Sequence, residues 1–190
     1  MKVKGLVYGV GINDVDCVTN CPFYSRWTDM LARCYSERFH IANPSYKGCS
    51  VCEEWKTFSN FKKWMEQDNW KGKQLDKDIL VPENKEYGPN TCIFVSHALN
   101  GLLIAQLSGR GKYPTGVSLN RNGYYLASLR IHGKNKTLGR TKTVEEASLL
   151  YKKARYEYLL EWSNNLTSEH TSDIERTKEA LIRHAGLLLG

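Results

Sequence analysis

The chain has 190 residues, of which 41% are hydrophobic and 11% aromatic, so it can build one globular body or two small modules. This composition excludes disorder as the default expectation. The formal net charge of +7 favours polyanionic partners, because clustered Lys and Arg release condensed counterions when they neutralise phosphates. Residues 107–160 hold eleven Lys or Arg and three Glu, a net of +8, so the whole positive excess lies in this segment.

The sequence lacks the signals of export and of membrane insertion. Residues 1–10 do not contain the apolar stretch of a signal peptide, and no run approaches the roughly 18 to 20 apolar residues of a membrane span. We therefore expect a soluble, cytoplasmic protein with no membrane partner.

Six cysteines in an intracellular chain suggest free thiols or metal ligands rather than disulfides. Two closely spaced pairs could together form a four-thiolate structural zinc site: Cys17, Cys21, Cys49 and Cys52. Cys34 and Cys92 could substitute for one of these ligands. The alternative is that the thiols are free and buried, which is common in protein cores.

Apolar residues at helical spacing predict two helices in the first half of the chain. One covers residues 24–35 and the other residues 55–65, with a short strand at Val51–Cys52 between them. We expect these helices to pack together and their tryptophans to lie in the core, where aromatic residues at such spacing usually belong.

Two short apolar runs, residues 75–80 and 92–95, are joined by a turn-rich segment and followed by a helix-like stretch. This order predicts a strand, strand, helix unit. Asp76 and Asp78 lie two apart on the first strand and so face one side, whereas Lys77 faces the other. Asp76 and Asn100 supply the hard oxygen ligands that magnesium prefers. The alternative is a solvated hairpin whose acids merely cap a strand.

Residues 75–79, 90–95 and Asn100 resemble the HNH, or ββα-metal, endonucleases, especially the phage-borne homing type. The resemblance covers about residues 5–105. It implies that Asp76 and Asn100 bind a catalytic Mg²⁺ or Mn²⁺ and that Asn90 steadies the base. Lys77 occupies the position of the histidine that activates water in that family.

Lys77 departs from the family pattern, because a lysine with a reference pKa of about 10.4 is protonated at neutral pH and cannot accept a proton. Two residues could replace it. His97 shares a helix face with Asn100 and can be neutral near pH 7. Asp78 could hold or deprotonate a metal-bound water from the metal face, and we favour it.

The basic segment predicts a three-stranded antiparallel sheet over residues 116–119, 124–131 and 136–139. Its middle strand alternates, and Asn122-Gly123 and His132-Gly133 are typical hairpin turns. Thr143-x2-Glu146 forms a capping box that begins a helix. An apolar stripe along that helix is expected to cover one face of the sheet: Ala147, Leu150, Tyr151, Ala154 and Tyr158.

Residues 113–156 closely resemble the Apetala/ethylene-response-factor DNA-binding domain, in Gly116-Val117, in residues 125–130 and in residues 138–154. The resemblance implies that the sheet lies in the DNA major groove. Thr115 and Ser118 stand where the plant domains place arginines, so the target sequence is not predicted. The candidate DNA-binding residues are Arg121, Tyr124, Arg130, Lys134, Lys136 and Arg140.

Together these features predict an α+β protein with a ββα-metal nuclease module at residues 1–107, a three-stranded sheet packed on one helix at residues 108–163, and a helical tail at residues 164–190. The expected function is site-directed, metal-dependent cleavage or nicking of double-stranded DNA by a monomer, in the host cytoplasm if a phage encodes it. One alternative is a non-catalytic, sequence-specific DNA-binding protein on a degenerate HNH scaffold. Another is a zinc-stabilised protein interaction module.

Overall fold

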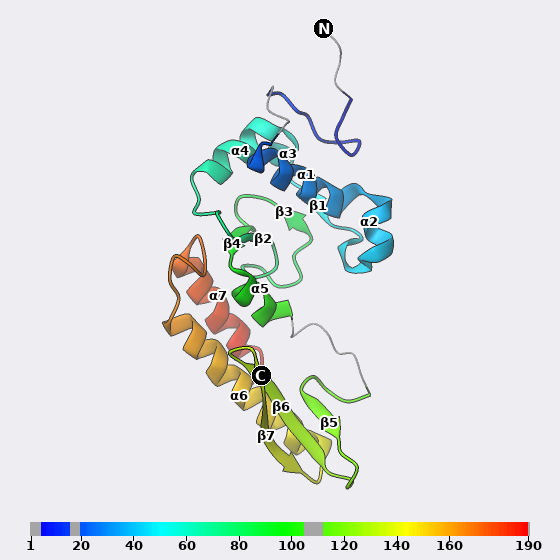
Figure 1. Ribbon diagram of the computed structural model, residues 1–190, viewed down its shortest axis with the longest axis vertical. Coiled ribbons are helices and arrows are strands. Elements are labelled where there is room, and N and C mark those ends of the chain that lie inside the picture. Colours follow the sequence, from blue (N-terminus) through cyan, green and yellow to red (C-terminus); the bar gives the residue numbers. More distant parts are fainter. Residues whose placement is uncertain (1–4, 16–19, 105–111, 190) are drawn as a thin grey trace. The chain divides into compact units, whose positions relative to one another are not determined.

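The computed structural model describes residues 5–15, 20–104 and 112–189 (Figure 1). Contacts divide the chain into two compact units, residues 1–97 with 168–173 and residues 98–167 with 174–190. Both helices and antiparallel strands are present, which confirms the α+β class. Within the described ranges, no helix is long and apolar enough to cross a membrane. The expected boundary at residues 107–108 lies outside the described residues.

Short elements build the first unit. In chain order they are α1 (Pro22–Tyr35), α2 (Glu37–Ala42), the 3-10 helix η1 (Pro44–Tyr46), β1 (Ser50–Val51), α3 (Glu53–Lys56), α4 (Phe58–Glu66), β2 (Gln74–Asp76), β3 (Glu86–Tyr87) and β4 (Ile93–Val95). β1 pairs in parallel with β3, and β2 pairs antiparallel with β4.

The helical core of the first unit follows the predicted spacing, with one correction. α1 buries Trp27 and its helical neighbours, as expected. The single helix predicted over residues 55–65 is two helices, because Thr57 between α3 and α4 is extended. Ile12 pairs with this residue: its N–H donates to the Lys56 carbonyl, and its own carbonyl accepts from the Phe58 N–H.

A third strand-like segment joins β2 and β4. Val95 forms an antiparallel bridge with Thr171. The Ser96 N–H donates to the His170 carbonyl at 2.7 Å, and the Ser172 N–H donates to the Phe94 carbonyl at 2.8 Å. Part of the tail predicted at residues 164–190 therefore belongs to the first unit.

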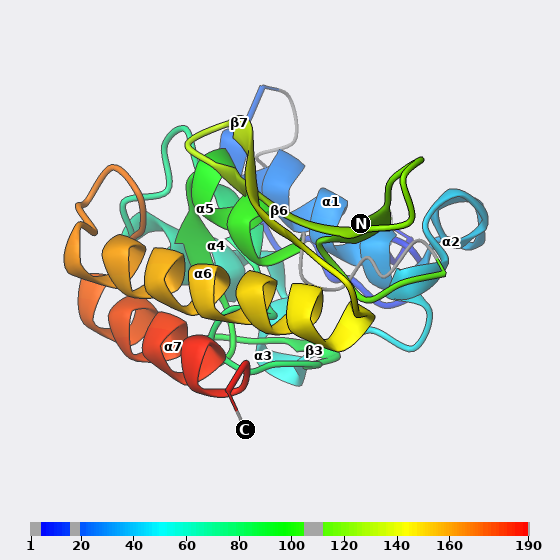
Figure 2. The same ribbon diagram turned by 90° about the horizontal axis from the view of Figure 1, so that it is seen from below.

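The second unit contains the sheet that the sequence predicts. Its elements are α5 (His97–Ile104, of which His97 is counted with the first unit), β5 (Val117–Leu119), β6 (Tyr125–Ile131), β7 (Lys134–Thr141), α6 (Val144–Asn164) and α7 (Ile174–Gly186). The three strands form an antiparallel sheet in the order β5-β6-β7. α6 packs against all three strands. It also packs along α7 (Figure 2).

Local sequence signals set the turns and the helix start of this unit. His132 and Gly133 both have positive φ, of 47° and 77°, as a two-residue hairpin turn requires. The Thr143 hydroxyl accepts from the Glu146 N–H at 3.2 Å, which confirms the predicted cap of α6. The β6–β7 pairing shifts by one residue after Ala127, so Leu138 forms a bulge.

The tail helix α7 leaves two of its large apolar residues, Ile174 and Ile182, exposed. The buried side of α7 consists of smaller and polar residues together with one leucine: Thr177, Ala180, Leu181, His184 and Ala185. Small side chains allow α7 to approach α6 closely, which the count of large apolar residues does not reveal.

Gly116 provides a test of how α6 packs on the sheet. Its φ is +77°, and a Cβ at this position would lie 2.0 Å from the Tyr151 ring. We expect Gly116→Ala to lower the free energy of unfolding by about 2–4 kcal/mol, from left-handed backbone strain and overpacking together. Gly123 is a matched control, because its φ is +79° but a Cβ there meets no atom within 4 Å.

Urea unfolding of the two variants measures the difference. Gly123→Ala should cost only the backbone strain, about 1–2 kcal/mol. Equal losses in the two variants would contradict the packing of Tyr151 on Gly116.

Candidate functional site

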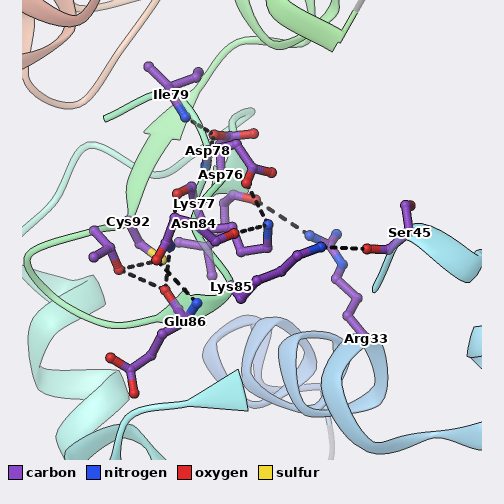
Figure 3. Close-up of polar contacts among 12 residues, drawn as sticks. Arg33, Ser45, Asp76, Lys77, Asp78, Ile79, Asn84, Lys85, Glu86 and Cys92 are labelled. Carbon is purple, nitrogen blue, oxygen red and sulfur yellow. Dashed lines mark hydrogen bonds and ion pairs between the residues drawn. The ribbon is translucent and has the colours of Figure 1, made fainter. Parts of the chain in front are cut away.

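Asp76 ends strand β2 and organises the turn that follows. Its Oδ1 atom accepts hydrogen bonds from the backbone N–H groups of Asp78 and Ile79, both at 2.8 Å (Figure 3). Such side-chain to backbone bonds compete with strand pairing and favour a turn. The expectation that Asp76 and Asp78 face the same side of one strand is therefore wrong, because β2 ends at Asp76.

The Asp76 carboxylate is half-buried, and one of its oxygens remains available. Burial raises the pKa of this carboxyl above its usual value, although the two backbone N–H groups act in the opposite direction. Both hydrogen bonds fall on Oδ1, and within the described residues Oδ2 accepts none. A half-buried carboxylate with one uncommitted oxygen suits a hard divalent cation, which would also relieve the cost of its charge.

Lys77 points into the core and closes the turn. It is only 6% exposed. Its Nζ donates to Asp78 Oδ1 at 2.6 Å and to the Asn84 carbonyl at 2.8 Å. In return, Asn84 Nδ2 donates to the Lys77 carbonyl at 3.0 Å (Figure 3). The Lys77 ammonium is thus a structural donor that joins both ends of the turn.

Two basic side chains attach this turn to the helices of the first unit. Arg33 on α1 donates through Nη1 to the Leu75 carbonyl at 3.4 Å. Lys85 donates through Nζ to the Ser45 carbonyl at 3.1 Å (Figure 3). Neither Arg33 nor Asn84 was among the site residues that the sequence suggested, because both act through backbone carbonyls that no motif records.

The other candidate catalytic residues lie apart from this cluster in the chain. Asn90 is exposed in the turn before β4, and His97 is exposed at the first position of α5. Asn100 is half-buried on α5 and belongs to the second unit, whereas Asp76 belongs to the first. The structure thus groups Asp76, Lys77 and Asp78, and the pairing of Asp76 with Asn100 stays a prediction.

The described cysteines of the predicted zinc site form no disulfide bond. Cys17 lies outside the described residues, Cys21 and Cys49 are buried, and Cys52 is half-buried. Burial raises the pKa of the Cys52 thiol, which opposes the thiolate form that binds zinc. In the described part of the chain, no three His, Cys, Asp or Glu side chains are grouped to hold a metal ion. The zinc site stays a prediction.

Strand pairing separates the candidate DNA-binding residues by face. Residues directly opposite each other in an antiparallel pair share a face of the sheet. Ala127 pairs with Gly139, whose Cβ would lie 3.0 Å from Leu150 on α6, so this face is covered by the helix. The opposite face, here named the open face, carries Ser118, Leu126, Ser128, Arg130, Asn135, Thr137 and Arg140.

Two arginines dominate the open face. Arg130 is exposed, and its Nε donates to the Gly133 carbonyl at 3.1 Å, which orients the guanidinium. The Arg140 guanidinium lies 5.6 Å from the centroid of the Tyr124 ring. An arginine held on an aromatic ring keeps its charge and its donors available to a polyanion.

The remaining basic candidates lie elsewhere on the sheet. Lys134 pairs with Ile131, and Lys136 pairs with Leu129, so both lysines belong to the face of the sheet that α6 covers. Both lysines are nevertheless exposed. Arg121 is exposed in the turn between β5 and β6. These three exposed charges are therefore not among the residues that form the open face.

Comparisons of the chain with protein-family models, curated proteins and solved structures found no match. The interpretation of the site therefore depends on the residues of this chain and on the resemblances of its motifs.

The Lys77–Asp78 ion pair predicts an asymmetric response to mutation. Lys77→Met removes a buried charge and leaves Asp78, whose side chain is 42% exposed, to be solvated by water, so it should change the free energy of unfolding by no more than about 1 kcal/mol. Asp78→Ala should destabilise by about 1–2 kcal/mol, because it leaves the buried Lys77 ammonium with the Asn84 carbonyl as its one remaining hydrogen-bond acceptor among the described residues.

Urea unfolding of both variants at neutral pH tests this order. A larger decrease in the free energy of unfolding for Lys77→Met than for Asp78→Ala would contradict this prediction.

Proposed function

We propose that the protein is a metal-dependent endonuclease that acts on double-stranded DNA. The Asp76 carboxylate is the observation that supports cleavage most, since one oxygen is fixed by two backbone N–H groups and the other is uncommitted among the described residues. Binding is assigned to the open face of the sheet in the second unit. The HNH-like and ethylene-response-factor-like motifs support the same division.

A divalent cation, Mg²⁺ or Mn²⁺, would supply charge stabilisation at the scissile phosphate. Asp76 would hold it through Oδ2, while its Oδ1 stays bound to the turn. The fixed turn keeps this carboxylate in one orientation, which is what a cation ligand requires. Asn100 remains a candidate second ligand on the strength of the resemblance alone.

Water activation is assigned to Asp78 rather than to Lys77. The Lys77 ammonium already donates to two acceptors and is buried, so it has no lone pair to accept a proton. The Asp78 side chain is 42% exposed, and only its Oδ1 takes part in the ion pair. Within the described residues, its second oxygen takes no part in this ion pair. His97 is the alternative base.

The open face suits DNA because it combines charge with small polar groups. Arg130 and Arg140 can bind phosphates or the O6 and N7 atoms of guanine. Ser128 and Thr137 pair with each other across β6 and β7. Their small side chains would let DNA approach the sheet closely. α6 covers the other face, so the open face is the side on which a ligand of the sheet would bind.

A second candidate function is a DNA-binding protein without catalytic activity. The Lys77–Asp78 ion pair favours this interpretation. A lysine stands in place of the usual base, and it forms an ion pair with one oxygen of the Asp78 carboxylate. Cleavage assays with the variants below distinguish the two functions.

Asp76→Asn should abolish magnesium-dependent nicking or linearisation of supercoiled DNA while leaving DNA affinity unchanged. The amide oxygen can still accept from Asp78 and Ile79, so the turn is retained, but the anionic ligand is lost. We expect a decrease in cleavage rate of at least about 100-fold, of the size seen when key electrostatic groups are removed. Gel assays and titrations with labelled DNA measure the two effects.

The pH dependence follows from the raised pKa of Asp76. Only the charged carboxylate binds a cation, so wild-type cleavage should increase as the pH rises through this raised pKa, above the range of an ordinary aspartate. Burial disfavours the charge, so wild-type stability should fall over the same range and Asp76→Asn stability should not. Undiminished cleavage by Asp76→Asn would overturn the assignment.

Arg130→Ala and Arg140→Ala should each weaken DNA binding and reduce the slope of log affinity against log salt by about 1 if the arginine contacts a phosphate. Lys152→Ala is the matched control, since Lys152 is an exposed cation on α6 and not on the sheet. Fluorescence anisotropy at several salt concentrations gives the slopes. An equal effect of all three substitutions would indicate that only net charge matters.

A further inference from the structure

Strand β4 has a neighbour on each side, and one of these neighbours is a segment more than 70 residues later in the chain. On one side it pairs with β2, with Asp76 opposite Ile93. On the other side it meets residues 170–172 through the Ser96–His170 and Ser172–Phe94 backbone bonds. The Phe94 N–H also donates to the Ser172 hydroxyl at 3.2 Å.

All three residues of β4 are buried. A buried strand must have its backbone N–H and C=O groups paired, because each unpaired group costs the free energy of its desolvation. Residues 168–173 meet this requirement at Phe94 and also bind the N–H of Ser96, the residue directly after the strand. Thr171 is itself only 1% exposed. Asn69 adds a side-chain donor to the Ser168 carbonyl at 3.0 Å.

The chain connects this segment directly to two helices of the other unit. α6 ends at Asn164 and α7 begins at Ile174. α6 and α7 pack against each other. The ends of the segment are therefore fixed by a folded helix pair, which lowers the entropy that the segment loses when it pairs with β4.

We propose that residues 168–173 act as a positioning strand that keeps β4, and through β4 the Asp76-bearing end of β2, in its native register. The β2–β4 sheet of the first unit thus depends on a segment that lies in the chain between the two packed helices of the second unit. This inference does not require Asp76 to be catalytic. If the proposed function holds as well, cleavage depends on the positioning strand whereas DNA binding does not.

Amide hydrogen exchange of the full chain, followed residue by residue by NMR, tests the proposal with a graded pair of variants. Ser172→Ala removes only the hydroxyl acceptor, so exchange at Phe94 should accelerate while Ser96 keeps its protection. Ser172→Pro also removes the Ser172 N–H, so exchange at both Phe94 and Ser96 should accelerate about tenfold or more, as the loss of a hydrogen bond of ordinary strength permits. Glu169→Ala, an exposed residue of the same segment, is the control and should change neither.

The amides of β5, β6 and β7 report on the second unit in the same spectra, and they should stay protected in every variant. Unchanged exchange at Phe94 in Ser172→Ala overturns the proposal even if Ser172→Pro fails to fold. Equal acceleration in both units overturns it too, because the segment would then support overall stability only. Absence of cleavage by the wild type, with the expected exchange pattern, rejects the proposed function and leaves the positioning strand intact.

Discussion

Two charged side chains at the end of strand β2 are buried or half-buried. Burying a charge costs free energy, and neighbouring groups of the first unit offset this cost. A half-buried carboxylate, Asp76, and a buried ammonium, Lys77, are adjacent in the chain and face different surroundings. Lys77 is satisfied by Asp78 and by the Asn84 carbonyl. Asp76 is satisfied on one oxygen only, by two backbone N–H groups. The first arrangement stabilises the turn, and the second leaves a ligand atom that the fold itself does not use.

The two units differ in how they present charge. In the first unit, Arg33, Lys77 and Lys85 donate to backbone carbonyls, so part of their charge serves the fold. In the second unit, Arg130 and Arg140 remain exposed on the open face. This difference agrees with the sequence, in which the net positive charge is concentrated in residues 107–160.

Sequence patterns predicted the features that depend on neighbouring residues. The Thr143 cap, the His132-Gly133 turn and the buried side of α1 each need only a few consecutive residues, and the structure confirms them. The break at Thr57 depends on Ile12, which lies 45 positions earlier, so no helical periodicity could reveal it. The pairing of β4 with residues 170–172 is likewise formed by backbone groups, which every sequence has and no motif marks.

The candidate site shows the same limit. The types of residue at Asp76, Lys77 and Asp78 suggested metal chemistry, but strand alternation gave the wrong position for Asp78, because the Asp76 side chain ends the strand. Asn84 completes the turn through one carbonyl and one amide, and its role could not be distinguished from that of an ordinary turn asparagine.

The central claim is that the Asp76 carboxylate binds a divalent cation, and paramagnetic broadening by Mn²⁺ tests it without any assay of activity. In NMR spectra of the full chain, small additions of Mn²⁺ should selectively broaden the amides of Asp78 and Ile79, which lie against this carboxylate. The selective broadening should disappear in Asp76→Asn. Broadening that is absent at these amides, or that persists in the variant, would contradict the account.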